Sequence, residues 1–247
     1  MNRPERMNAL NWQLLDDLNA AIKKANGDDE IRVMILTGKG NGFCTGADLS
    51  QDAREGVPDP GRRVKLQPFQ RFGELAILLR ETDKPVIAAV NGAAVGAGFA
   101  VALGCDIRIA SDRARFSSIF VKRALVPDTG ATYYLPRLIG VGKALEMMFT
   151  GEIIGAEEAE RIGLVNRVVP HEELMGVTKE LAEKIAKGPP IAIELTKRIV
   201  YKGLGVGDLA TQVGYEGWAQ SVCAQSEDVK EGRQAFLEKR EPMFKGR

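Results

Sequence analysis

The pattern of apolar and polar positions predicts a mixed α/β chain that ends in helices. Apolar residues recur at helical spacing from Leu10 to Ala25, so we expect an amphipathic helix that ends near Asn26-Gly27. Strands that alternate with helices predict βα units packed on a sheet. The strands are expected at 31–37, 85–90 and 106–110, the helices between and after them at 66–80 and 130–139, and a run of helices alone at 172–187, 189–202, 209–223 and 228–239.

Two segments of small residues follow predicted strands. The segment 91–98, Asn-Gly-Ala-Ala-Val-Gly-Ala-Gly, leads from the strand at 85–90 into an apolar helix, and the segment 42–49, Gly-Phe-Cys-Thr-Gly-Ala-Asp-Leu, follows the strand at 33–36. Small residues at such a junction let a ligand approach bare backbone N–H groups. Two of these donors aimed at one oxygen would form an oxyanion hole. Tight packing of a helix on a sheet explains the glycines equally well.

Length and charge narrow the function classes. The 247 residues can bury a full core, as one large domain or as a domain with an appendage. The net charge of +1 gives no global field that would favour nucleic acid or an anionic membrane. No apolar run reaches membrane-spanning length, residues 1–6 contain no apolar stretch of the signal-peptide type, and three scattered cysteines argue against a disulfide framework. We therefore expect a soluble cytoplasmic protein that binds neither nucleic acid nor membranes.

Several catalytic chemistries lack their residues. His171 is the one histidine, and its place in Val-Pro-His-Glu-Glu predicts an exposed residue in the first turn of a helix. No Gly-x-Ser-x-Gly motif occurs, and no His/Cys cluster has metal-ligand spacing, so no metal is expected. The glycines at 92, 96 and 98 do not fit a dinucleotide-binding motif. The segment 51–64 is rich in Asp, Arg, Gly and Pro, which predicts a mobile surface loop.

A set of motifs runs along the chain: Asn2-Arg3-Pro4, Asn8-Ala9-Leu10, Gly46-Ala47-Asp48-Leu49, Asn91-Gly92 with Gly96-Ala97-Gly98, Cys105 to Ala110, and Leu135 to Gly140. As a set these motifs resemble the crotonase family, the enoyl-CoA hydratases and isomerases. The resemblance implies an α/β spiral of ββα units at 1–188, a helical C-terminal trimerisation region at 189–247, and a homotrimer or a dimer of trimers. Family members usually have a strand before the Asn-Arg-Pro motif, and we expect that N-terminal strand to be missing here.

The resemblance also implies a site. The backbone N–H groups of Ala47 and Ala97 would form the oxyanion hole, which stabilises the enolate formed when a proton is removed beside a thioester carbonyl. Coenzyme A would enter as part of an acyl-CoA substrate, with no permanently bound cofactor. By their motif positions, the residues expected to bind it are Arg6, Met7, Ala9, Thr45, Asp48 and Leu49, together with Phe236 and Lys239 offered by a neighbouring subunit.

Some of these residues have a plainer explanation. The Asp48 side chain suits local hydrogen bonding within a turn. Phe236 and Lys239 fit the apolar and charged faces of an ordinary amphipathic helix. Glu74 and Glu81 are predicted to be solvated surface charges, and Cys44 to be a buried, inert thiol.

The catalytic carboxylates are where the chain departs from the family pattern. The hydratases carry two glutamates. The first matching position here is Ala100 and the second falls near Phe120, within the segment 116–120, and neither residue can exchange a proton. Asp128, in Pro127-Asp128-Thr129-Gly130, resembles the base of the single-aspartate isomerases, which include the ring-opening isomerases of phenylacetate breakdown and the 3-enoyl to 2-enoyl isomerases. Read from the residues alone, Asp128 is equally well the N-cap of a helix that begins near Thr129.

These residues predict an isomerase that shifts a double bond from the 3-enoyl to the 2-enoyl position. Asp128 would remove a proton beside the thioester and return it two carbons further along the chain. Three alternatives stay open. Asp128 alone could activate water in a hydratase, or act as a nucleophile in a dehalogenase-like or hydrolytic enzyme, or the chain could bind acyl-CoA without catalysis.

Overall fold

Four parallel strands form the sheet at the centre of the chain. The computed structural model describes residues 1–50, 62 and 71–247. The sheet consists of β1 (Met34–Thr37), β3 (Val86–Val90), β5 (Ile107–Ser111) and β8 (Arg167–Val169), in the order β1-β3-β5-β8. Every residue of β3 is buried, which is why this strand has a continuous apolar sequence rather than an alternating one. The predicted strands at 85–90 and 106–110 are confirmed to within a residue, and the strand predicted at 31–37 begins later, at Met34.

A second sheet of short strands was not predicted by the apolar pattern, although the ββα units that the family resemblance implies contain such strands. It consists of β2 (Gly42–Cys44), β4 (Ala93–Val95), β6 (Arg115–Ser117) and β7 (Ile154–Gly155), in the order β2-β4-β6-β7, with β7 antiparallel. Strands of two or three residues are too short to show a periodic pattern. Because β1, β3 and β5 in the first sheet are each followed by a strand of the second, the chain advances as a spiral of ββα units.

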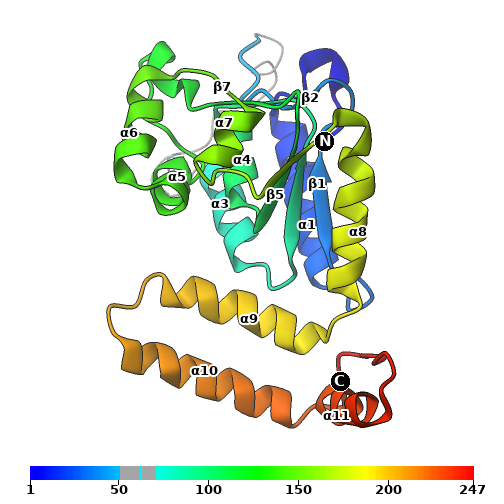
Figure 1. The fold of residues 1–247 in the computed structure, drawn as a ribbon. Coiled ribbons are helices and arrows are strands. Elements are labelled where there is room, and N and C mark those ends of the chain that lie inside the picture. Colours follow the sequence, from blue (N-terminus) through cyan, green and yellow to red (C-terminus); the bar gives the residue numbers. More distant parts are fainter. Residues whose placement is uncertain (51–61, 63–70) are drawn as a thin grey trace.

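Helices cover both faces of the central sheet (Figure 1). Helix α1 begins at Trp12 because the Asn11 side chain accepts a hydrogen bond from the Leu14 N–H at 2.9 Å. On one face, α8 packs against Ile87 and Ile109 of the sheet. The helices of the spiral are α1 (Trp12–Asn26), α3 (Arg71–Glu81), α4 (Ala97–Gly104), α5 (Ala131–Ile139), α6 (Val141–Thr150), α7 (Ala156–Arg161) and α8 (Leu174–Ala186), with 3-10 turns η1 (Pro4–Arg6), η2 (Ile119–Arg123) and η3 (His171–Glu173).

Helix α4 lies in the interior of the spiral. All eight of its residues are buried, and Phe99 on α4 packs against Phe116 of β6 with ring centroids 6.2 Å apart. The helix predicted at 130–139 is confirmed as α5, with Pro136 inside it. The helix predicted at 66–80 is confirmed from Arg71 onward; residues 66–70 lie outside the described part of the chain, as does the predicted loop at 51–64 apart from residue 62.

The last three helices form a separate layer beneath the spiral (Figure 1). They are α9 (Pro190–Gly203), α10 (Leu209–Ala224) and α11 (Glu227–Glu238), close to the ranges expected from the sequence. Their assignment to an oligomerisation region stays a prediction, as does the boundary after residue 188. No helix in the described ranges is long and apolar enough to cross a membrane.

Candidate active site

The two small-residue segments meet where β2 ends and α4 begins. Gly98, on the first turn of α4, lies so close to the Cys44 carbonyl oxygen that a Cβ at residue 98 would clash with it. Gly46 has a φ of +95°, and a Cβ there would lie 2.9 Å from the Val95 oxygen and 3.3 Å from the Ala97 nitrogen. Glycine is therefore required at both positions. Because neither residue has a side chain, the backbone around Ala47 can lie against the start of α4.

The backbone N–H groups of Ala47 and Ala97 are both available at this junction. Ala47 forms a parallel bridge with Leu10, in which the Leu10 N–H donates to Gly46 O at 2.7 Å and the Asp48 N–H donates to Leu10 O at 2.9 Å. Because these two bonds are made by Gly46 and Asp48 on either side of Ala47, the N–H of Ala47 itself points away from Leu10. Ala97 is the first residue of α4, where N–H groups have no partner within the helix.

Neither of these N–H groups donates a hydrogen bond to another residue within the described part of the chain. The positive end of the α4 dipole adds to the attraction for a negatively charged oxygen. The structure therefore brings the chain around Ala47 against the start of α4, and the oxyanion hole formed by these two N–H groups stays a prediction.

Three polar side chains near the N-terminus and on the loop after β3 hold this junction. One Arg3 Nη1 donates to Ala9 O at 2.6 Å and to Asp48 Oδ2 at 2.9 Å. Asn8 Nδ2 donates to Gly42 O at 2.7 Å, and Asn91 Nδ2 donates to Gly40 O at 2.8 Å. Sequence reasoning gave these residues no role, although each lies in a motif that carried the family resemblance. The sequence signal that could have found the two asparagines is an Asn beside a glycine-rich turn, where its amide can satisfy backbone oxygens.

Asp48 acts within its own turn, as its plainer explanation predicted. Its Oδ1 accepts hydrogen bonds from the Ser50 N–H at 3.1 Å and from the Ser50 hydroxyl at 2.7 Å, and its Oδ2 is paired with Arg3. Burial raises the pKa of this carboxyl, but the bonds from Ser50 and Arg3 together outweigh burial and the net pKa is lowered. Asp48 is therefore a carboxylate with its oxygens occupied, unsuited to proton transfer.

Cys44 beside the hole is buried and inert, as predicted. Its side chain is fully buried, and burial raises the pKa of its thiol to about 12. A thiol with that pKa is protonated at neutral pH and is a poor nucleophile.

Asp128 lies on the segment between η2 and α5, and its side chain is exposed. The N-cap of α5 is Gly130, with no side-chain cap, so the hypothesis that Asp128 caps this helix is wrong. The reason is local: Thr129 takes a φ of +53°, and the Asp128 backbone oxygen, not its carboxylate, accepts from the Ala131 N–H at 2.9 Å. The carboxylate accepts a hydrogen bond from the Thr129 hydroxyl at 2.8 Å.

The segment that carries Asp128 follows β6 of the second sheet and the 3-10 turn η2. Gly96, which precedes Ala97, donates its N–H to Ser117 O on β6 at 3.0 Å, and the chain then continues through η2. The two positions where a family hydratase would have glutamates are apolar and buried here: Ala100 is 1% exposed and Phe120 is 8% exposed. Glu74 and Glu81 on α3 are exposed, as expected of surface charges.

Most of the residues expected to bind coenzyme A gather around Ala47. Met7 O accepts hydrogen bonds from the Thr45 N–H at 3.2 Å and from its hydroxyl at 3.4 Å, which joins the 6–9 segment to the 45–49 segment. Leu49 is 53% exposed at the edge of this surface. Arg6 and Ala9 lie on the first of the two segments and Asp48 on the second.

Phe236 and Lys239 are not part of this surface within one chain. They lie at the end of α11, in the layer on the far side of the spiral, and Phe236 is 83% exposed (Figure 1). A contribution from these two residues requires a second copy of the chain.

His171 differs from its prediction. It begins η3, as expected, but it is half-buried and its Nδ1 lies 3.0 Å from the Ser111 hydroxyl, so it ties η3 to the end of β5. Ser111 is fully buried. Within the described residues no group of His, Cys, Asp and Glu has the arrangement of a metal site.

Comparisons with known proteins agree over the length of the chain. The family model for enoyl-CoA hydratase/isomerase matches residues 1–247. A short-chain-enoyl-CoA hydratase from Clostridium acetobutylicum is 42% identical over 241 residues, 97% of this chain and 90% of that protein. A 1,2-epoxyphenylacetyl-CoA isomerase from Escherichia coli is 38% identical over 250 residues, 100% of this chain and 94% of that protein.

Solved structures show the same fold. A crystal structure of an enoyl-CoA hydratase from Bacillus anthracis matches with a TM-score of 0.91 and 40% sequence identity, over 99% of this chain and 93% of that one. The matching spiral, the full-length family model and the relatives above 30% identity lead to one conclusion: the chain is an enzyme of the enoyl-CoA hydratase/isomerase, or crotonase, family.

Proposed function

We propose that the chain is an acyl-CoA isomerase that moves a double bond from the 3-enoyl to the 2-enoyl position. The thioester oxygen accepts hydrogen bonds from the N–H groups of Ala47 and Ala97, and these fixed donors lower the energy of the enolate. Removing one such donor costs about 3–4 kcal/mol of barrier in enzymes that use this device. Both donors belong to the backbone, so the side chains at 47 and 97 need only be small.

Asp128 is the base in this proposal. Its carboxylate takes the proton from the carbon next to the thioester, which leaves the negative charge on the oxygen in the hole. It then returns the proton two carbons further along, so the double bond comes into conjugation with the carbonyl. One carboxylate suffices because it gives back the proton that it took.

The observation that carries the proposal is which side chains stand at the positions of the family's catalytic carboxylates. Ala100 and Phe120 are buried apolar side chains where a hydratase would have its two glutamates, while Asp128 is exposed and does not cap a helix. Addition of water needs one group to deprotonate the water and another to supply a proton. The residues present suit a single proton shuttle better than that pair of steps.

Hydration is the second candidate, because several relatives, including the one at 42% identity, bear the name of a hydratase. In this alternative Asp128 alone activates water. Coenzyme A takes part as a portion of the substrate in both candidates, and no permanently bound cofactor is invoked.

A panel of thioesters tested on the native protein separates these candidates. We expect a 3-enoyl-CoA to be converted to the conjugated 2-enoyl-CoA. Hydration of crotonyl-CoA, followed by its loss of absorbance, should be slower. A ring-epoxide thioester should also be isomerised. If crotonyl-CoA is hydrated faster than the 3-enoyl thioester is isomerised, the isomerase proposal is wrong and the hydratase stands. Absence of turnover on all three thioesters would contradict both candidates.

A further inference from the structure

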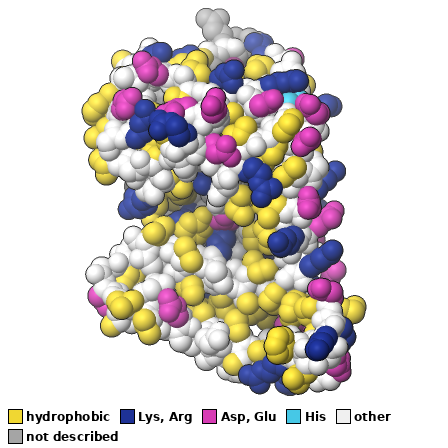
Figure 2. Space-filling model, in the orientation of Figure 1, with side chains coloured by type: hydrophobic (Ala, Val, Ile, Leu, Met, Phe, Trp, Pro, Cys, Tyr) yellow, Lys and Arg dark blue, Asp and Glu magenta, His cyan; other side chains and the backbone are white. Residues whose placement is uncertain are grey.

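A cavity of about 400 Å³ opens between the spiral and the C-terminal layer, away from the candidate active site. Figure 2 shows the molecule hollowed between these two parts, with hydrophobic side chains on the facing walls. The walls come from the C-terminal end of α4, from α5 and from α9. They are predominantly apolar and aromatic, as the walls of small-molecule sites are. Leu103, Leu138 and Ile193 are among the apolar residues that line it.

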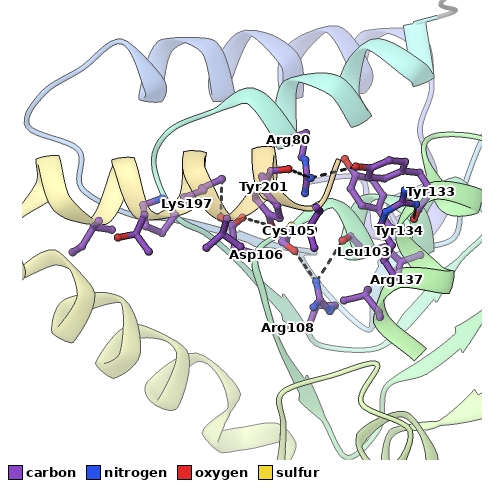
Figure 3. A pocket seen from close by; sticks show the side chains of 16 residues that line it. Arg80, Leu103, Cys105, Asp106, Arg108, Tyr133, Tyr134, Arg137, Lys197 and Tyr201 are labelled. Atoms are coloured by element: carbon purple, nitrogen blue, oxygen red, sulfur yellow. Dashed lines mark hydrogen bonds and ion pairs between the residues drawn. The ribbon is translucent and has the colours of Figure 1, made fainter. Parts of the chain in front are cut away.

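Two arginines are stacked on tyrosines at this cavity (Figure 3). The Arg80 guanidinium lies 3.6 Å from the centroid of the Tyr201 ring, and the Arg137 guanidinium lies 3.7 Å from that of Tyr133. Arg80 donates to the backbone carbonyl oxygen of Tyr201 at 2.9 Å and to the Tyr133 hydroxyl at 3.3 Å. Arg137 donates to the backbone carbonyl oxygen of Tyr133 at 2.9 Å. Stacking fixes the plane of each guanidinium while leaving some of its five N–H donors unused.

The charges around the cavity are unbalanced. Asp106 is the carboxylate in its wall, and its oxygens are occupied by the Lys197 ammonium at 2.7 Å, the Tyr201 hydroxyl at 2.6 Å and the Val86 N–H at 2.7 Å. Neither Arg80 nor Arg137 forms an ion pair with a carboxylate in the described part of the chain. The cavity therefore combines an apolar interior with two positive charges that lack a negative partner there.

A third arginine in the wall, Arg108, is not available to bind a ligand. It is 5% exposed, and it donates to the backbone oxygens of Leu164 at 2.8 Å and Cys105 at 2.6 Å. Its guanidinium is committed to holding the end of α4. The positions open to a ligand are those of Arg80 and Arg137.

We propose that this cavity binds an organic anion with an apolar body, of the class of medium-chain carboxylates. The alkyl chain lies among the leucines and tyrosines, and the carboxylate accepts hydrogen bonds from Arg80 and Arg137. Planar guanidinium groups match a carboxylate in geometry as well as charge. The site is distinct from the oxyanion hole: Ala97 and Leu103 stand near opposite ends of α4, roughly 9 Å apart at 1.5 Å per residue.

Octanoate is the probe that tests this proposal, with 1-octanol and octylammonium as matched ligands of the same chain length. Calorimetric titration of the native protein should show saturable binding of octanoate, and octanoate should raise the melting temperature as its concentration rises. We expect 1-octanol to bind at least tenfold more weakly and octylammonium not to bind. Equal binding of octanoate and 1-octanol would overturn the proposal, because the arginines would then contribute nothing.

Two arginine variants locate the binding. Arg137→Gln should weaken octanoate binding at least tenfold. Arg137 is exposed, and its hydrogen bond and ring contact are with Tyr133 within α5, so the fold should persist. Arg71→Gln is the matched control, because Arg71 also stacks on an aromatic ring, that of Trp12, but does not line the cavity. Loss of binding in both variants, or in neither, would contradict the assignment.

A variant that fills the cavity makes the test independent of charge. Val200 lines the cavity on α9 and is 51% exposed, so Val200→Trp should obstruct the site without removing a core contact. Octanoate binding should be lost in this variant while its melting temperature without ligand stays near that of the native protein. Unchanged binding by the variant would place octanoate elsewhere on the protein. No binding by the native protein at millimolar octanoate would mean that the cavity is closed to the ligand. Either result overturns the proposal.

Discussion

At the scale of single residues, the candidate site depends on side chains that are absent as much as on those that are present. Gly46 and Gly98 let two backbone segments touch, and the side chains of Ala47 and Ala97 are small. The two positions require glycine for different reasons. Gly46 adopts a backbone conformation that other residues rarely take, and Gly98 leaves room for a carbonyl oxygen.

Replacing Gly98 by Ala tests this close approach. The added Cβ meets the Cys44 carbonyl oxygen, which is backbone and cannot rotate away, so α4 must shift. We expect a loss of about 3 kcal/mol in the free energy of unfolding, at the upper end for an overpacked core, together with loss of turnover. Urea denaturation measures the first. Gly142→Ala on α6, where no atom lies within 4 Å of the new Cβ, is the control and should be neutral or slightly stabilising.

The lowered pKa of Asp48 makes part of the stability depend on pH. Its hydrogen bonds to Ser50 and Arg3 hold its pKa below the ordinary value near 3.8, so the unfolded chain takes up the proton first as the pH falls. The stabilisation is complete above that ordinary value and is lost as the pH falls through the folded-state pKa. Asp48→Asn should therefore be less stable than the native protein at pH 6 and approach it toward pH 3. A difference in unfolding free energy that stays constant over this range would refute the assignment.

At the scale of elements, α9 is held to the spiral by polar contacts more than by apolar ones. Leu195 is its one buried residue among those described, whereas Arg198 forms a two-bond ion pair with Asp83 at 2.9 and 2.6 Å. Lys197 reaches deeper, to Asp106 and to the Lys84 oxygen at 3.0 Å, and its side chain is 7% exposed. Burial lowers the pKa of this lysine despite the nearby carboxylate.

Asp106→Asn should loosen this contact. The substitution leaves the Lys197 ammonium buried without its negative partner, and breaking a buried pair in this way costs about 3 kcal/mol. Chemical denaturation of the variant at pH 7 measures the loss. Asp112→Asn, which changes an exposed carboxylate next to the same strand, serves as the control. A double variant with Lys197→Met should recover part of the stability; if it is less stable than Asp106→Asn alone, the buried charge is not the cause.

How far the sequence predicts these elements depends on their length. The strands at 85–90 and 106–110 and the four C-terminal helices have apolar patterns long enough to be recognised, and the structure has them near the predicted bounds. The second sheet was missed because β2, β4 and β6 have three residues each and are stabilised by pairing with distant segments. In the candidate site, Ala47 and Ala97 were predicted from their motifs, and their role as an oxyanion hole stays a prediction. The roles of Arg3, Asn8 and Asn91 were not predicted, because each depends on a contact with a distant turn.

At the scale of the whole molecule, the C-terminal layer exposes more apolar surface than a helix pair on a single chain needs. Ala219 is the buried residue of α10, while Leu209 is 77%, Val213 is 51% and Trp218 is 47% exposed. Exposed apolar residues that gather on one part of a molecule are typical of protein–protein contacts. Assembly through this layer, as a trimer or a dimer of trimers, would also bring Phe236 and Lys239 of one copy toward the substrate surface of another.

Trp218→Glu tests that assembly. A charge in the middle of the proposed interface should lower the mass observed by sedimentation velocity at micromolar concentration, since a buried, unpaired charge opposes association. Gln220→Glu adds the same charge two residues away on the same helix and should have a smaller effect. A native protein that sediments as a monomer would contradict the prediction.

The most direct test of the central claim, that Asp128 moves the proton while the backbone of Ala47 and Ala97 holds the thioester oxygen, is the rate of 3-enoyl-CoA isomerisation by Asp128→Asn. Asparagine keeps the shape of the side chain but cannot accept the proton. Because a positioned general base contributes about 10²–10⁴-fold, kcat should fall by that factor while the Kd for a non-reactive acyl-CoA stays within about twofold. Native turnover in this variant would contradict the account.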